Sequence, residues 1–205
     1  LESVLECCSR IRVKKEYMDI HEEDLAKIND LAEELNKEGM HVIGVAAKKK
    51  SVGDTTVFHA EDETNMTFLG IIAFLDPPKP DAKEAIRGLY DAGVHVKVIS
   101  GDAPVVVEHV CKLVGMKVGD QSAVTGSDLE NMSDAELSSV VEKNDIFARL
   151  SPMQKKRVVD ALRNNGHVVG YMGDGVNDAP SLHDADVGIS VDNGTDVAKA
   201  SADII

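Results

Sequence analysis

The chain has 205 residues, of which 43% are hydrophobic, and its formal net charge is −14. This length and apolar content are enough for one sizeable core, or for one core with a smaller lobe, and they exclude a disordered or fibrous protein. The negative charge would repel a phosphate backbone, so we expect no nucleic acid among the partners.

The cysteines and the apolar runs indicate the kind of cellular compartment in which the chain is found. Cys7 and Cys8 are neighbours and Cys111 stands alone, so the chain has neither a disulfide framework nor a spaced metal-binding set, as is typical of a reducing compartment. No apolar run is as long as a membrane span, and the first residues do not begin a secretory signal. The sequence therefore predicts a soluble chain.

The first part of the chain predicts a small lobe. Apolar residues recur at helical spacing from Asp24 to Lys37, and Gly39 follows as a helix stop. The apolar and partly β-branched run from His41 to Ala47 predicts a strand. The polar stretch from Lys48 to Asn65 predicts a solvated loop, with a short strand at Thr55 to His59.

A proline segment follows this lobe. Thr67 to Leu75 predicts a second buried strand, which ends at the sequence Asp76-Pro77-Pro78-Lys79-Pro80. Its three prolines exclude both a helix interior and a sheet ladder. The segment is either a stiff hinge between two lobes or a plain connector.

Beyond the prolines, helices and strands alternate. We expect helices at 82–89, 106–113, 134–142 and 152–163, and strands at 94–99, 145–148, 168–172 and 187–190. This alternation predicts right-handed crossovers and a doubly wound α/β fold around a parallel sheet. Ligands of such sheets bind at the carboxyl ends of the strands.

The segment Gly173 to Pro180 is the most informative one in the chain. It places two carboxylates, Asp174 and Asp178, four residues apart just beyond the apolar run from His167 to Met172. Mg²⁺ takes a few carboxylate oxygens and keeps its other positions for water and phosphate, so the segment suits Mg²⁺ beside a phosphate. A solvated loop or a helix cap would also explain the pair.

Two further features fall at expected strand ends. Ser100, Gly101 and Asp102 follow one strand and could hold phosphate oxygens with a hydroxyl and amides, or could simply cap the next helix. Lys155 lies in the first turn of a helix opened by Ser151 and Pro152. A cation is unfavourable at that end, so Lys155 either points to solvent or neutralises an anion. Together with the carboxylates, these are parts that phosphoryl transfer needs, but no nucleophile accompanies them.

The order of these motifs resembles that of the P-type ATPases, ion pumps whose phosphorylation domain belongs to the haloacid dehalogenase-like superfamily. The matching segments are Asp76 to Lys79, Ser100 to Asp102, Phe147 to Lys155 and Gly173 to Pro180. The stretches Ser151 to Lys155, Gly188 to Asp192 and Ala202 to Ile205 look most like the magnesium-transporting bacterial branch.

The resemblance implies a division into two domains and a role in a larger pump. Residues 1–76 would be the C-terminal part of a nucleotide-binding (N) domain, and residues 77–205 a phosphorylation (P) domain that lacks its nucleophile strand. The pump would couple ATP hydrolysis, through an aspartyl phosphate, to transport of a cation such as Mg²⁺. Its partners would be ATP, an actuator domain, membrane helices and the cation, with this part on the cytoplasmic side of the cell membrane.

The resemblance also implies residue roles. Asp174 and Asp178 would bind Mg²⁺, Lys155 would neutralise the aspartyl phosphate, and Ser100 would bind its oxygens. The supporting residues would be Gly101 and Asp102 in the phosphate loop, Gly175 and Asn177 in the metal loop, and Lys79 near the nucleotide.

Two departures from the family pattern matter. The phosphorylated Asp of the family's Asp-Lys-Thr-Gly motif is absent, so we expect this chain alone to be inactive. Gly39-Met40-His41 has His where many relatives carry an Arg near the nucleotide. A soluble phosphatase of the same superfamily and a non-catalytic Mg²⁺-binding module remain alternatives to the pump.

Overall fold

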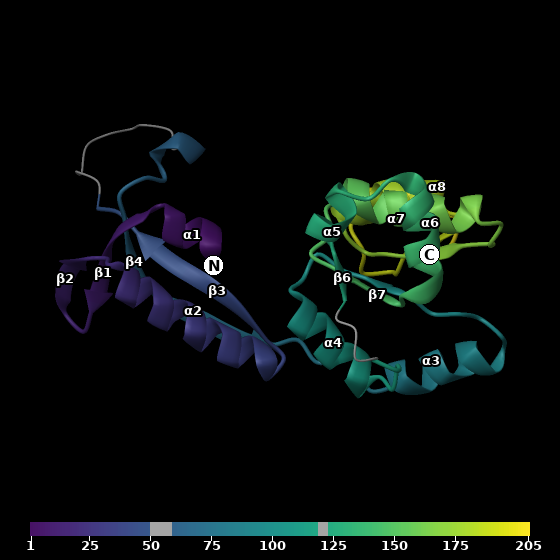
Figure 1. The fold of residues 1–205 in the computed structure, drawn as a ribbon, viewed down its shortest axis with the longest axis horizontal. Coiled ribbons are helices and arrows are strands. Elements are labelled where there is room, and N and C mark those ends of the chain that lie inside the picture. The colour runs from purple at the N-terminus through teal and green to yellow at the C-terminus, as the bar shows by residue number, and fades with distance from the viewer. Residues whose placement is uncertain (50–58, 119–122) are drawn as a thin grey trace. The chain divides into compact units, whose positions relative to one another are not determined.

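The computed structural model describes residues 1–49, 59–118 and 123–205, and the chain divides into two compact units, Leu1–Pro77 and Pro78–Ile205 (Figure 1). The division falls within the proline segment. The short strand predicted at Thr55 to His59 lies outside the described residues except for His59, which precedes a 3-10 turn, Ala60–Asp62.

The first unit is an α+β lobe with a mixed sheet. Its sheet has the order β2-β1-β4-β3, with β1 and β4 parallel and the other pairs antiparallel. Helices α1 and α2 both pack on β3. The elements are α1 (Glu2–Glu6), β1 (Cys8–Val13), β2 (Glu16–Asp19), α2 (Glu22–Lys37), β3 (Met40–Ala47) and β4 (Met66–Leu75).

In this lobe, β3 packs closely against α1, whereas part of β4 is exposed. Gly44 of β3 lets the backbone approach α1, because a Cβ there would lie 3.0 Å from the Leu1 side chain and 3.2 Å from Val4. On β4, Phe68 is buried, but Ile72 is 57% exposed and Leu75 is also exposed. The second half of β4 therefore differs from the buried strand that its apolar residues predict, because hydrophobicity alone does not say which strand residues another layer will cover.

The second unit alternates helices with short parallel strands. The strands form one sheet of order β5-β7-β6 and one of β8-β9, and all their pairings are parallel. The elements are α3 (Ala82–Asp91), β5 (Val98–Ile99), α4 (Pro104–Leu113), β6 (Val124–Thr125), α5 (Gly126–Glu130), α6 (Asp134–Lys143), β7 (Ile146–Ala148), α7 (Pro152–Asn164), β8 (Gly170–Met172), α8 (Ala179–Asp184), β9 (Val187–Ile189) and α9 (Asp196–Ser201).

The α/β class predicted for this unit is confirmed, with three differences in detail. The strand expected at 94–99 is regular only at Val98–Ile99, and β6 with α5 was not predicted. Within the described residues the parallel strands form two sheets instead of the single one expected. Strands of two or three residues carry too little hydrophobic pattern to be recognised from sequence.

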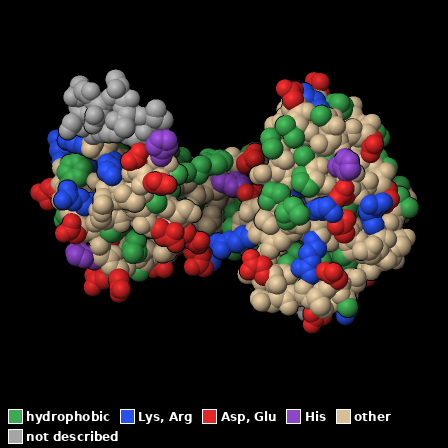
Figure 2. Space-filling view, turned by 90° about the horizontal axis from the view of Figure 1, so that it is seen from above, with side chains coloured by type: hydrophobic (Ala, Val, Ile, Leu, Met, Phe, Trp, Pro, Cys, Tyr) green, Lys and Arg blue, Asp and Glu red, His purple; other side chains and the backbone are tan. Residues whose placement is uncertain are grey.

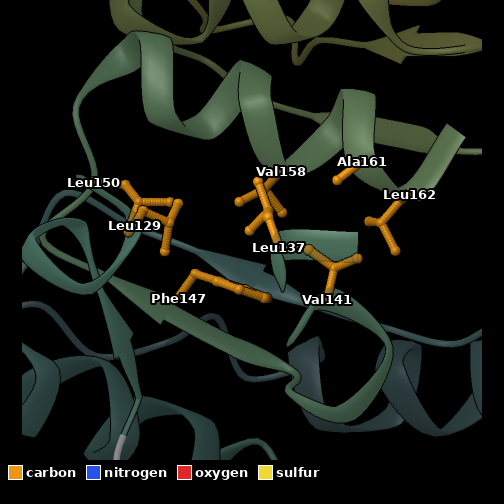
Figure 3. Packing of buried hydrophobic residues seen from close by; sticks show 8 residues of the cluster. All are labelled: Leu129, Leu137, Val141, Phe147, Leu150, Val158, Ala161 and Leu162. Atoms are coloured by element: carbon orange, nitrogen blue, oxygen red, sulfur yellow. The ribbon is translucent and has the colours of Figure 1, made fainter. Parts of the chain in front are cut away.

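Strand β7 lies at the centre of the second unit. Its three residues are all buried. Phe147 packs in one cluster with residues of α5, α6 and α7, and Figure 3 shows Phe147 and Val158 of α7 pointing toward one another. Ile146 and Ala148 pack in a second cluster with α4. Because successive strand residues point to opposite faces, helices cover this sheet on both sides.

The surface is charged on both units. On the face in Figure 2, Lys and Arg side chains lie among Asp and Glu side chains. Of the helices in the described part of the chain, none is both long and apolar enough to span a bilayer.

The cluster around Phe147 predicts a clear contrast between two leucines. Leu137→Ala should lower the free energy of unfolding by about 2–5 kcal/mol, because Leu137 is 1% exposed and its removal leaves a cavity. The matched control, Leu113→Ala, should cost much less, since Leu113 is 51% exposed. Urea unfolding followed by circular dichroism measures both, and equal losses would contradict this placement of the core.

Candidate functional site

The loops after β5 and β7 are joined by backbone hydrogen bonds. Ser100 N donates to Phe147 O over 2.9 Å, and Leu150 N donates to Ser100 O over 3.0 Å. Arg149 N donates to Asp102 O over 2.9 Å, and Arg149 has a left-handed backbone with φ of 52°. The Ser100 loop therefore lies directly beside the segment that leads into α7.

Ser100 orders its own loop and does not cap the next helix. Its Oγ donates to Asp102 Oδ2 over 2.8 Å and accepts a hydrogen bond from Asp102 N over 3.1 Å. Helix α4 has Ala103 at its N-cap, without a side-chain cap. The cap interpretation of Ser100 is therefore wrong, because its hydroxyl and the Asp102 amide bond within the loop.

Helix α7 starts as the sequence predicts. Ser151 caps it, accepting from Gln154 N over 3.3 Å, while Gln154 Oε1 accepts from Ser151 N over 2.8 Å. One residue on, Lys155 Nζ lies 2.8 Å from Asp178 Oδ1, and both side chains are 13% exposed. Lys155 thus neutralises an anion and does not point to solvent.

Asp178 accepts hydrogen bonds at both of its oxygens. Besides Lys155, Oδ1 accepts from Tyr171 OH over 2.9 Å, and Oδ2 accepts from Gly175 N over 3.2 Å. Burial by itself would raise the pKa of Asp178, but the hydrogen bond and charge of Lys155, with the other two donors, hold this pKa below its ordinary value. Asp178 is therefore ionised at neutral pH.

Glycine and the loop after β9 shape the carboxylate segment. Gly173 has no room for a side chain, because a Cβ there would lie 2.5 Å from the Cβ of Asp178. Gly173 N donates to Ile189 O over 3.1 Å, and Thr195 N donates to Asp174 O over 2.8 Å. These contacts fix the backbone of Asp174 while its side chain remains exposed.

The donor set fits a Mg²⁺ ion that is completed by other ligands. No three His, Cys, Asp or Glu side chains gather as a metal site anywhere in residues 1–49, 59–118 and 123–205. Mg²⁺ is commonly held by one or two carboxylates, with phosphate and water in its other positions. The exposed Asp174 and the ionised Asp178 match that need, whereas a cage made wholly of protein ligands is not built here.

The other residues predicted for the site differ in their exposure and in their contacts. Asn177 is exposed, and Gly175 contributes the amide that binds Asp178. Gly101 lies near the loop after β7, since a Cβ on it would be 3.7 Å from Leu150 O. Lys79 is exposed just before α3, where its carbonyl accepts from Ala82 N over 3.0 Å.

Three contributors to the site were missed from the sequence. Tyr171 was counted only as part of an apolar strand, although a hydroxyl in a buried strand needs a partner and so signals a polar contact. Gln154 Nε2 donates to Gly126 O over 2.8 Å, which ties the start of α7 to α5. Gly126 has no space for a Cβ, which would overlap Arg149 O. No local sequence signal connects these last two segments.

The sequence matches known proteins of one family. The family described as "P-type ATPase, cytoplasmic domain N" matches residues 1–81. A "Magnesium-transporting ATPase, P-type 1" of Salmonella typhimurium is 52% identical over 174 residues, which is 84% of this chain and 19% of that protein. This chain belongs to the P-type ATPase family.

Two more P-type ATPases align along the whole chain. The magnesium-transporting ATPase of Escherichia coli is 42% identical over 205 residues, which is 100% of this chain and 22% of that protein. "Calcium-transporting ATPase 1" of Bacillus cereus is 34% identical over 206 residues and is covered to 23%. The chain thus spans only about a fifth of the length of these relatives.

The pair between Lys155 and Asp178 predicts a large cost for losing the cation. Lys155→Met should destabilise the chain by about 3–5 kcal/mol, because it leaves a buried carboxylate without a counter-charge. In the neighbouring control, Lys156→Met, the lost ion pairs are more exposed, and the cost should stay below about 1 kcal/mol. Urea unfolding measures both, and adding Asp178→Asn to Lys155→Met should restore part of the loss. A Lys155→Met variant as stable as Lys156→Met would contradict this.

The depressed pKa of Asp178 predicts a pH dependence of stability. In the unfolded chain the Asp178 carboxyl has an ordinary pKa of about 3.9. The stabilisation of the folded state by the ionised carboxylate is therefore fully present above that pH. It is lost as pH falls through the lower pKa of the folded state. The stability difference between the wild-type chain and Asp178→Asn should therefore shrink on acidification. Urea unfolding across the acid range tests this, and a pH-independent difference would refute it.

Proposed function

We propose that this chain is the cytoplasmic catalytic part of an ATP-driven cation pump, and that the cation is Mg²⁺. In this proposal residues 1–76 are the C-terminal part of the N domain. Residues 77–205 are a P domain of the haloacid dehalogenase-like type, without its nucleophile strand. The observation that carries the proposal is the buried pair of Lys155 and Asp178, with their side chains 13% exposed, at the start of a helix whose preceding segment is hydrogen-bonded to the Ser100 loop.

In this proposal the residues of the three loops have separate roles in phosphoryl transfer. Asp174 and Asp178 would hold Mg²⁺, which when bound neutralises charge on phosphoryl oxygens. Lys155 would supply a second positive charge from a position at which it is already desolvated. Ser100 and the amide of Gly101 would donate hydrogen bonds to phosphoryl oxygens, with the Ser100 hydroxyl turning from Asp102, and Asp102 would order the loop.

The edges of the two parallel sheets support the proposal of a further strand that the described residues do not contain. Strand β5 is an end strand of one sheet and β8 an end strand of the other. Ile99 and Val169, at these two strands, both pack against the cluster around Phe147 and against the cluster around Tyr171. We propose that the strand bearing the phosphorylated aspartate pairs between β5 and β8. Its carboxyl end would then reach Ser100, Lys155 and Asp174 together.

The first unit supports a role in nucleotide binding. It lies within the segment that matches the N domain family, and we propose ATP as its ligand. Within it, His41 stacks on Phe74 with ring centroids 5.5 Å apart. We propose that Lys79, in the connecting segment, lies near the nucleotide.

The pump accounts for more of the chain than its alternatives do. A soluble phosphatase needs no unit of the N domain type, yet residues 1–81 match one. A non-catalytic Mg²⁺-binding module would not need Lys155 buried against a metal-ligating carboxylate. The proposal places the chain on the cytoplasmic side of the cell membrane, with an actuator domain, membrane helices and the transported cation as partners.

Phosphorylation of the full-length pump tests the proposal. Asp174→Asn should lower the yield of acyl-phosphate from γ-labelled ATP by about 100-fold or more, because charge stabilisation of the phosphoryl group is lost. Asp91→Asn, an exposed carboxylate of α3, is the matched control and should leave the yield unchanged. The 205-residue chain by itself should form no acyl-phosphate. An unchanged yield in Asp174→Asn, or hydroxylamine-sensitive labelling of the chain alone, would refute the proposal.

A further inference from the structure

The Oδ1 atom of Asp178 has two donors of different character. Lys155 Nζ lies 2.8 Å from it and Tyr171 OH lies 2.9 Å from it. The ammonium of Lys155 sits on a flexible four-carbon stem and can turn its N–H groups to other acceptors. The Tyr171 hydroxyl sits on a rigid ring.

The core holds the Tyr171 ring in place. Tyr171 belongs to β8 and is 8% exposed. It packs in one cluster with Val159 of α7, Leu182 of α8 and Ala198 of α9. The Tyr171 hydroxyl donates to Asp178 Oδ1, because a carboxylate oxygen can only accept. Asp178 therefore has one fixed donor and one movable donor at the same oxygen.

Lys155 Nζ donates one hydrogen bond to Asp178 Oδ1, and a phosphoryl oxygen that it neutralises would compete with Asp178 for the ammonium. When its ammonium turns, a buried carboxylate with no other donor at Oδ1 would be free to rotate or would lose a strong hydrogen bond. We propose that Tyr171 is a positioning residue: its hydroxyl keeps the Asp178 carboxylate in one orientation while Lys155 turns to a phosphoryl oxygen. This inference rests on the proposed role of Lys155.

The alternative is that Tyr171 only fills the core. Tyr171→Phe separates the two roles, because it keeps the ring and removes only the hydroxyl. Lys155→Met imitates the moment at which the ammonium has left Asp178, since it keeps a side chain of similar length without a donor. Tyr90→Phe, on the exposed helix α3 of the same unit, is the matched control.

The test measures the χ1 rotamer of Asp178 by three-bond couplings in the isotope-labelled 205-residue chain. A single rotamer is expected in the wild type, in Lys155→Met and in Lys155→Met with Tyr90→Phe. Averaged couplings are expected when Lys155→Met is combined with Tyr171→Phe. A single rotamer in that last variant would show that Gly175 N suffices, and averaging in Lys155→Met alone would show that Tyr171 does not hold Asp178. Either result overturns the inference. Lys155→Leu, which also lacks a donor, replaces Lys155→Met if the latter does not fold.

A metal titration separates this inference from the proposed function. Mn²⁺ added in place of Mg²⁺ should broaden the amide signals of Gly175 and Asp178 in the wild-type chain. Adding Tyr171→Phe to Lys155→Met should raise the Mn²⁺ concentration needed by about 10-fold relative to Lys155→Met alone, the usual scale for losing a partner of a metal ligand. An unchanged concentration would contradict the positioning role. Absence of broadening in the wild type would refute the metal role of Asp178 in the proposed function, while the couplings would still decide the role of Tyr171.

Discussion

The ion pair between Lys155 and Asp178 is the interaction on which the site depends. It joins the first turn of α7 to the segment between β8 and α8, over 2.8 Å, with little exposure of either side chain. Two desolvated charges are tolerated only when they face each other and have further hydrogen bonds, and Tyr171 and Gly175 supply these. The pair therefore helps to fix the first turn of α7 against the segment before α8, together with the ion pair of Lys156 with Asp184.

The same pair explains why Lys155 can lie where the helix dipole disfavours it. A cation in the first turn of a helix is repelled by the unpaired N–H groups, and Asp178 compensates for this repulsion. The segment just before the helix is held separately, since Leu150 N and Arg149 N donate hydrogen bonds to the Ser100 loop.

Small residues decide how closely these loops approach. Gly173 allows Asp178 to fold back against its own loop, and Gly126 allows the α5 segment to lie against Arg149 O. In both places the missing Cβ allows backbone and side-chain atoms to come within contact distance, so that the polar groups can meet. The glycines flanking the carboxylates thus have a packing role as well as the turn role that is evident from the sequence.

The sequence by itself determined the α/β character of the chain, the proline segment between two lobes, the entry to α7 and the motifs that mark a P-type ATPase. These are local: periodicity, capping residues and prolines act within a few residues of one another. Only the tertiary structure decided that Ser100 orders its loop instead of capping α4, that Lys155 faces Asp178 instead of solvent, that the parallel strands divide into two sheets, and that Tyr171 reaches the site. The pairing of Lys155 with Asp178 and the division of the strands depend on contacts between residues far apart in the chain, which are set by how helices and strands pack. Ser100 and Tyr171 bind partners only two and seven residues away, but the surrounding packing decides which of several possible hydrogen bonds each hydroxyl makes.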